Sequence, residues 1–141
     1  MIKVNVILNN KNWKKFLKYP KSFIEKKIEI LNKKNKISKK KYIFSLVLSD
    51  KTEITKLNKK FRKKNKSTDV LSFPFYEKRM LGLKTRKEKE IYLGDVIINL
   101  EKIKNKKDQV KFETELNRLW IHGLLHLFGH NHKKNKDFFI M

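Results

Sequence analysis

The chain has 141 residues, the length of one ordinary domain, and its 37 basic against 14 acidic residues give a formal net charge of +23. It contains no cysteine, which excludes disulfides, cysteine-based zinc sites and a thiol nucleophile. The absence of cysteine fits a reducing, cytoplasmic setting. The apolar residues, 39% of the sequence, suffice for one core but form no run near the ~20 residues of a membrane span, so we expect a single domain over residues 1–141 that does not bind a membrane.

The hydrophobic pattern predicts strands interspersed with helices. Strands are indicated where apolar residues alternate or form short runs, and helices where they recur every three or four residues. In chain order, the pattern predicts a strand at Ile2–Leu8, a helix after Pro20, a charged loop at Asn32–Lys40, a strand at Tyr42–Leu48, a helix capped by Ser49 and Asp50, a strand at Val70–Phe75, a charged loop at Glu77–Glu90, a strand at Tyr92–Leu100, and helices near Glu101–Lys107 and Val110–Phe128. This order favours mixed α/β layering over a barrel or a helix bundle.

The net charge favours a polyanionic partner, because a strongly basic surface attracts nucleic acid through long-range fields and counterion release. However, 33 of the 37 basic residues are Lys, and Asn and Ile are also abundant. This composition is equally typical of a coding bias towards A and T, which would raise the charge without selection for binding. The charge agrees with an RNA partner but does not establish one.

All four histidines lie between His122 and His132, in the sequence HGLLHLFGHNH. On a helix, positions four residues apart share a face, so His122 and His126 could both reach one cation. The other faces of this helix are apolar, which indicates a buried helix whose imidazoles need partners. Each ring could instead bind a backbone carbonyl, but one shared metal would satisfy both.

Three neutral histidines suit a catalytic zinc better than a structural one, because they leave the charge of the ion intact and a coordination position open for water. Hydrolysis is the implied reaction class. Spacing alone leaves the third ligand open: His130 would serve if the helix persisted, and His132 if the chain turned back at Gly129. Gly123 stands where an H-E-x-x-H peptidase carries its general base, so a zinc peptidase is disfavoured.

Three blocks of the sequence resemble the YbeY family of bacterial metal-dependent endoribonucleases, which act as rRNA maturation factors. The segment 122–132 is similar to the family signature H-G-x-L-H-L-x-G-Y-D-H. LNKKFRKKNKSTDVLSFPF (57–75) resembles its L-N-x-x-[YF]-R segment followed by T-D-V-L-S-F-P, and LGDVIIN (93–99) resembles its G-D-I/V strand. The blocks occur in the order of the family and cover the chain from about residue 57 to residue 132.

The resemblance implies that His122, His126 and His132 bind one Zn²⁺ per chain. It also implies that Arg62 is the functional arginine, whose planar guanidinium suits a phosphate of the substrate. The alternative for Arg62 is a surface cation on an amphipathic helix. We place Thr68, Asp69, Ser72 and Asp95 outside the catalytic set, because turn and strand-end hydrogen bonding explains them equally well.

The fold that the resemblance implies is α+β: a single domain with a central mixed sheet of about four strands flanked by helices, and a zincin-like histidine helix near the C-terminus. The implied function is zinc-dependent endonucleolytic cleavage of single-stranded RNA in 16S rRNA 3′-end maturation and ribosome quality control. RNA and the small ribosomal subunit are the expected partners, and DNA is not expected. The alternative is a ribosome assembly factor that binds metal and RNA without cleavage.

The sequence departs from the family pattern at two places. His130 and Asn131 replace the usual Tyr and Asp, which makes His130 a competing ligand and removes any role of that acid. The family usually continues into a C-terminal helix, and Asp137–Met141 would correspond to the beginning of that helix.

Overall fold

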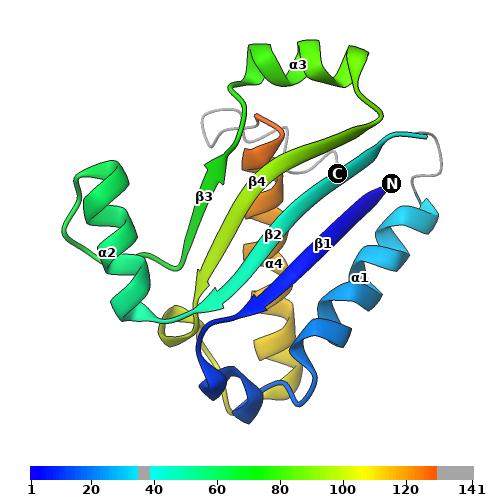
Figure 1. The fold of residues 1–141 in the computed structure, drawn as a ribbon. Coiled ribbons are helices and arrows are strands. Elements are labelled where there is room, and N and C mark those ends of the chain that lie inside the picture. Colours follow the sequence, from blue (N-terminus) through cyan, green and yellow to red (C-terminus); the bar gives the residue numbers. More distant parts are fainter. Residues whose placement is uncertain (35–38, 130–141) are drawn as a thin grey trace.

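A computed structural model describes residues 1–34 and 39–129, and over this part of the chain four strands form one sheet in the order β1-β2-β4-β3. β2 is parallel to both β1 and β4, whereas β3 pairs antiparallel with β4 at the edge (Figure 1). The elements in chain order are β1 (Ile2–Leu8), η1 (Lys11–Lys15), α1 (Pro20–Lys34), β2 (Lys41–Ser49), α2 (Lys51–Arg62), β3 (Val70–Pro74), α3 (Lys78–Lys87), β4 (Glu90–Asn99), η2 (Leu100–Lys102) and α4 (Gln109–Leu127).

Side-chain caps explain where the helices α2 and α4 begin. The Asp50 carboxylate accepts a hydrogen bond from the backbone N–H of Glu53 at 2.9 Å, and Asp108 caps α4 by accepting from the N–H of Lys111 at 3.1 Å. Such caps satisfy donors in the first turn that have no partner inside the helix. α4 ends at Leu127, and the following Gly129 has a φ of +93°, a backbone conformation that favours glycine.

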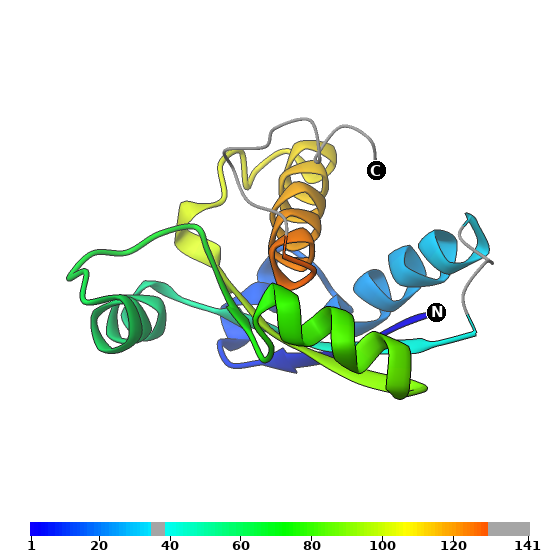
Figure 2. The same cartoon turned by 90° about the horizontal axis from the view of Figure 1, so that it is seen from above.

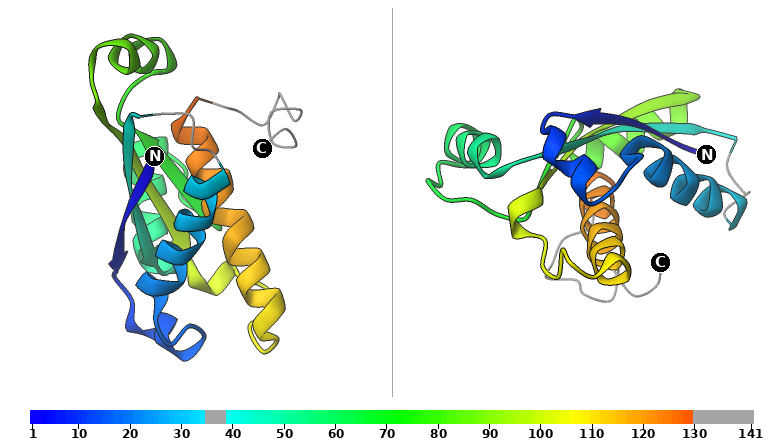
Figure 3. Two further views of the ribbon diagram at one scale, coloured as in Figure 1. Left: turned by 90° about the vertical axis from the view of Figure 1, so that its right-hand side faces the viewer. Right: turned by 90° about the horizontal axis from the view of Figure 1, so that it is seen from below.

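The main core lies between the sheet and the helices α1 and α4, which cover the same face (Figures 2 and 3). Trp13, Phe44 and Phe112 are completely buried there, and the indole N–H of Trp13 donates to the carbonyl of Ser49 at 2.9 Å. A smaller cluster of Ile54, Leu71 and Ile97 packs α2 against the sheet. No helix in the described ranges is both long and apolar enough to cross a bilayer.

The structure confirms the expected α+β class and the mixed four-stranded sheet, with strand bounds within two residues of those predicted. Three local predictions are wrong. The charged segment Glu77–Glu90 contains α3, and α1 continues to Lys34 into the expected loop. The helix expected near Glu101–Lys107 is only the 3₁₀ turn η2, after which Asn105 adopts a left-handed φ of +60° that stops helical continuation.

Candidate active site

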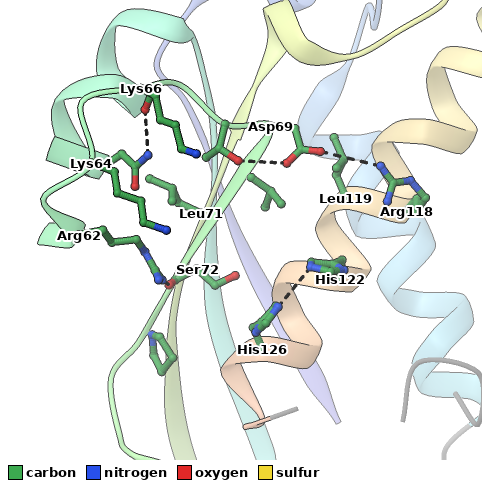
Figure 4. A pocket seen from close by; sticks show the side chains of 14 residues that line it. Arg62, Lys64, Lys66, Asp69, Leu71, Ser72, Arg118, Leu119, His122 and His126 are labelled. Carbon is green, nitrogen blue, oxygen red and sulfur yellow. Dashed lines mark hydrogen bonds and ion pairs between the residues drawn. The ribbon is translucent and has the colours of Figure 1, made fainter. Parts of the chain in front are cut away.

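α4 carries His122 and His126 on one face, where both imidazoles are half-buried. Their Nε2 atoms lie 3.2 Å apart (Figure 4). Two nitrogens that bind one tetrahedral zinc at 2.0–2.1 Å are separated by about 3.3 Å, so the pair fits a shared ion without rearrangement. The same distance also suits a hydrogen bond between a protonated and an unprotonated ring nitrogen. The pair can therefore hold either a proton or a cation between its rings.

The two candidates for a third metal ligand, His130 and His132, both lie outside the described residues. Within residues 1–34 and 39–129, no group of three or more His, Asp or Glu side chains could hold a metal ion. The donor set that the described residues contribute is thus two neutral imidazoles, which suits zinc and leaves positions for further ligands. The assignment of His132 remains a prediction.

Gly123 allows the histidine-bearing turn of α4 to lie directly against the sheet. A Cβ atom at this position would come within 2.4 Å of Val96 Cγ1 on β4, a distance that real contacts do not show. From β3, the Ser72 hydroxyl donates to the carbonyl oxygen of Gly123 at 3.0 Å, and this bond is buried. Sequence reasoning used Gly123 only to disfavour a peptidase; its second role, close packing beside His122, depends on a contact between distant segments.

A cavity of about 520 Å³ opens in front of the histidine pair, between α4, β3 and the loop that follows α2. Arg62 stands at the end of α2 and lines this cavity together with both histidines (Figure 4). Its Nη2 donates to the carbonyl of Ser72 at 2.8 Å, and its guanidinium carbon lies 5.7 Å from the centre of the Phe73 ring. These two contacts fix the guanidinium plane against β3, on the wall opposite α4.

Lys64 and Lys66 add two more cations to the cavity wall, on a loop that two buried amides hold in place. Asn58 is 3% exposed and donates from Nδ2 to the carbonyl of Lys66 at 2.8 Å. Asn99 is completely buried and donates to the carbonyl of Thr68 at 3.2 Å. Sequence reasoning missed both asparagines. The L-N pair that begins the second block was a signal for Asn58, but its partner could not be predicted.

Arg118 lines the end of the cavity one helical turn before His122. Two of its nitrogens bind the Glu115 carboxylate at 3.0 and 2.7 Å, and Nη2 lies 3.9 Å from Asp69. The hydrogen bond from Arg118 is the largest cause that lowers the pKa of Glu115, so this carboxylate is ionised at neutral pH. Sequence reasoning missed Arg118, although its spacing of four residues from His122 placed it on the same face.

The four polar residues that we kept outside the catalytic set have different positions. Thr68, Asp69 and Ser72 line the cavity. Asp95 accepts a short hydrogen bond from the Tyr92 hydroxyl, whose oxygen in turn accepts one from the Ser45 hydroxyl. Burial and then this bond to Asp95 raise the pKa of Tyr92. Asp95 thus has a structural partner on its own strand.

The described residues define an α+β protein in which a histidine helix faces a basic cavity that contains an arginine. The profile of the family described as "Endoribonuclease YbeY" matches residues 7–141. The chain is 41% identical to the Endoribonuclease YbeY of Pelagibacter ubique over 98% of its own length and 88% of that protein, and 34% identical to that of Ehrlichia canis over 100% and 86%. The chain therefore belongs to the YbeY endoribonuclease family, as the resemblance predicted.

A solved structure supports the same fold. The solution structure of the Thermotoga maritima protein TM1509 is 29% identical in sequence and superposes with a TM-score of 0.52, covering 94% of this chain and 75% of that one.

Proposed function

We propose that the protein is a zinc-dependent endoribonuclease that hydrolyses phosphodiester bonds of single-stranded RNA. The observation that carries the proposal is the cavity in which Arg62 and the pair His122 and His126 face each other across β3 and α4. Relatives that share most of the length of the chain bear the name endoribonuclease. We further propose 16S rRNA 3′-end maturation and ribosome quality control as the cellular role, in the cytoplasm and on the small ribosomal subunit.

In this proposal, His122, His126 and His132 hold the zinc, with His130 as the competing third ligand. A zinc ion bound there would supply Lewis-acid charge and a water of lowered pKa. Arg62 binds a non-bridging oxygen of the scissile phosphate and stabilises the negative charge that develops during attack. Its bond to the Ser72 carbonyl occupies only one of five N–H donors, so others can serve the phosphate.

The rival function is a ribosome assembly factor that binds metal and RNA without cutting. The cavity supports hydrolysis more directly, because Arg62 is positioned by the Ser72 carbonyl and the Phe73 ring and faces the same space as the imidazoles. Preorganised charge next to a metal is what phosphodiester hydrolysis requires, whereas binding alone does not.

Zinc content and cleavage of ribosomal RNA test the proposal in the parent, His126→Ala, Arg62→Ala and Arg62→Lys. Arg86→Ala is the matched control, since Arg86 is exposed on α3. We expect His126→Ala to lose both zinc and cleavage. Arg62→Ala should keep zinc and cleave on the order of 100-fold more slowly, with partial recovery in Arg62→Lys.

The outcomes separate the alternatives. If every variant cuts equally, the activity is a contaminating nuclease and the proposal fails. If the folded, zinc-loaded parent binds RNA but cuts nothing, the assembly factor is correct. For the cellular role, precursor 16S rRNA with an extended 3′ end should accumulate in cells whose only copy carries Arg62→Ala, but not in cells with Arg86→Ala.

A further inference from the structure

A second cavity, of about 320 Å³, lies beside the histidine pair and shares Pro74 and His126 with the basic cavity. Its lining adds the aromatic residues Phe75 and Tyr76 and the apolar Leu127 to one acidic and one basic residue, Glu77 and Lys78. The volume lies at the lower end of the range of small-molecule pockets. His126 therefore stands at the boundary between a basic cavity and an aromatic one.

The Phe75 ring is exposed yet held in position. Phe75 is 65% exposed to solvent. The ring packs edge to face on Tyr76 and Tyr92, with centroid distances of 4.8 and 5.9 Å. Such contacts stabilise one orientation of a ring. A ring that is both exposed and held in one orientation offers its face for stacking to a flat partner.

The backbone that carries Phe75 is fixed as well. The N–H of Phe75 donates to the carbonyl of Leu93 at 2.9 Å. Gly94, which pairs with the neighbouring Pro74, has a φ of +136°, and a Cβ there would lie 2.2 Å from the carbonyl oxygen of Phe73. Only glycine permits this close approach of β3 and β4. The position of Phe75 relative to His126 is thus set by the sheet and not by a free loop.

We propose that Phe75 is a stacking platform for one nucleobase of the RNA, next to the phosphate that lies at the histidine pair. This inference rests on the proposed function for its RNA ligand. The basic cavity with Arg62 and Lys64 would bind the sugar-phosphate backbone. On the other side of His126, the base would stack on the Phe75 ring and be removed from solvent. Aromatic stacking is the usual way in which proteins bind bases of a single strand without reading their sequence.

The same arrangement gives a reason for preferring single strands. In a duplex, each base is already stacked and paired, so a base can reach Phe75 only after both interactions are broken. A single strand avoids most of this cost. An apolar protein segment would also cover the ring, but the cavity continues into a basic one on a chain of net charge +23, which favours a ligand that is both flat and anionic.

Fluorescence of 2-aminopurine tests the proposal, because stacking of this base on an aromatic ring quenches its emission. The probe is a short single-stranded RNA with one 2-aminopurine, titrated with the parent, Phe75→Leu, Phe75→Trp and Tyr19→Leu. Tyr19 is the matched control, since it is 68% exposed and precedes α1, outside both cavities. The protein is used as purified, and emission is recorded directly after mixing so that the intact probe is measured.

We expect the parent and Tyr19→Leu to bind equally and to quench the probe. Phe75→Leu should bind about tenfold more weakly with little quenching, and Phe75→Trp should restore both. Equal affinity and quenching for the parent and Phe75→Leu would overturn the subsite even if the protein cuts RNA. Conversely, Phe75-dependent quenching by a protein that never cuts would leave the subsite standing and refute the endonuclease.

Discussion

The Ser72 hydroxyl on β3 donates to the carbonyl oxygen of Gly123 on α4, and this single buried bond of 3.0 Å joins the two walls of the candidate active site. The carbonyl of Ser72 itself accepts from Arg62 at 2.8 Å. One residue of the edge strand therefore connects the arginine on one side of the cavity to the histidine helix on the other. Small changes at this contact are expected to alter the distance between Arg62 and the imidazoles.

Gly123→Ala should lower stability by about 1–3 kcal/mol, because the new methyl group would overlap Val96 and force α4 away from the sheet. Urea unfolding measures this loss. Gly82→Ala is the matched control, since Gly82 lies in α3 with nothing within 4 Å of its added Cβ. The control should be more stable by about 0.5–1 kcal/mol. Equal stability of Gly123→Ala and the parent would show that α4 does not pack as tightly as described.

Asn58→Ala should weaken RNA binding through the loop that carries Lys64 and Lys66. The substitution removes the bond to the Lys66 carbonyl, and a buried partner lost in this way costs about 1–3 kcal/mol of stability. Binding of single-stranded RNA is measured well below the unfolding temperature, in a cycle with Lys66→Ala. If Asn58 acts by positioning Lys66, the double variant binds about as weakly as the weaker single variant. Strictly additive losses would argue against a positioning role.

Lys64→Ala should make RNA affinity less sensitive to salt. Each lysine that contacts a phosphate releases condensed counterions, and its removal should reduce the slope of log K against log salt by about 0.7 for a single strand. Lys21→Ala, on the exposed surface of α1, is the control and should keep the parent slope. Titrations at several salt concentrations give both slopes. Identical slopes for the two variants would mean that the cavity is not where the backbone binds.

Asp50→Ala should lower the free energy of unfolding by about 1 kcal/mol at neutral pH, because it removes the cap of α2. The N–H of Glu53, and then the Asn10 amide, lower the pKa of Asp50 below its usual 3.8. A lowered folded-state pKa stabilises the fold above pH 3.8, and this contribution is lost as the pH falls through the lower folded value. The difference between parent and variant in urea unfolding should therefore shrink towards pH 3. A difference that stayed constant down to that pH would exclude the charge of Asp50 as its source.

The sequence predicted the sheet well because strand patterns are local. In β1, Ile2, Val4 and Val6 are buried or half-buried as the alternation indicates, although Leu8 at the end of the strand is exposed. The side-chain cap at Asp50 was also visible in the sequence before α2. α3 was missed because only Leu81 of its ten residues is buried, and Glu77 before it makes no side-chain cap bond. Its helical state depends on neither an apolar stripe nor a side-chain cap, the two features by which a helix is recognised in a sequence.

For the candidate site, the sequence predicted what the helical repeat determines: His122 and His126 side by side on α4. Arg62 came from the family resemblance, and the structure places it in the same cavity. The bond from Ser72 to Gly123 and the two buried asparagines could not be predicted, because each joins segments that only the tertiary fold brings together. The third zinc ligand stays a prediction, since His130 and His132 lie outside the described residues.

The order of strands has a consequence for biosynthesis. β3 precedes β4 in the chain but pairs with it alone among the described strands, so β3 has no place in the sheet until β4 has left the ribosome. α4 is synthesised after β4, and its residue Gly123 lies 51 positions beyond Ser72, to which it is hydrogen-bonded in the folded protein. A nascent chain that ends before α4 would contain Arg62 without the histidine pair, so the two walls of the candidate site would not yet face each other.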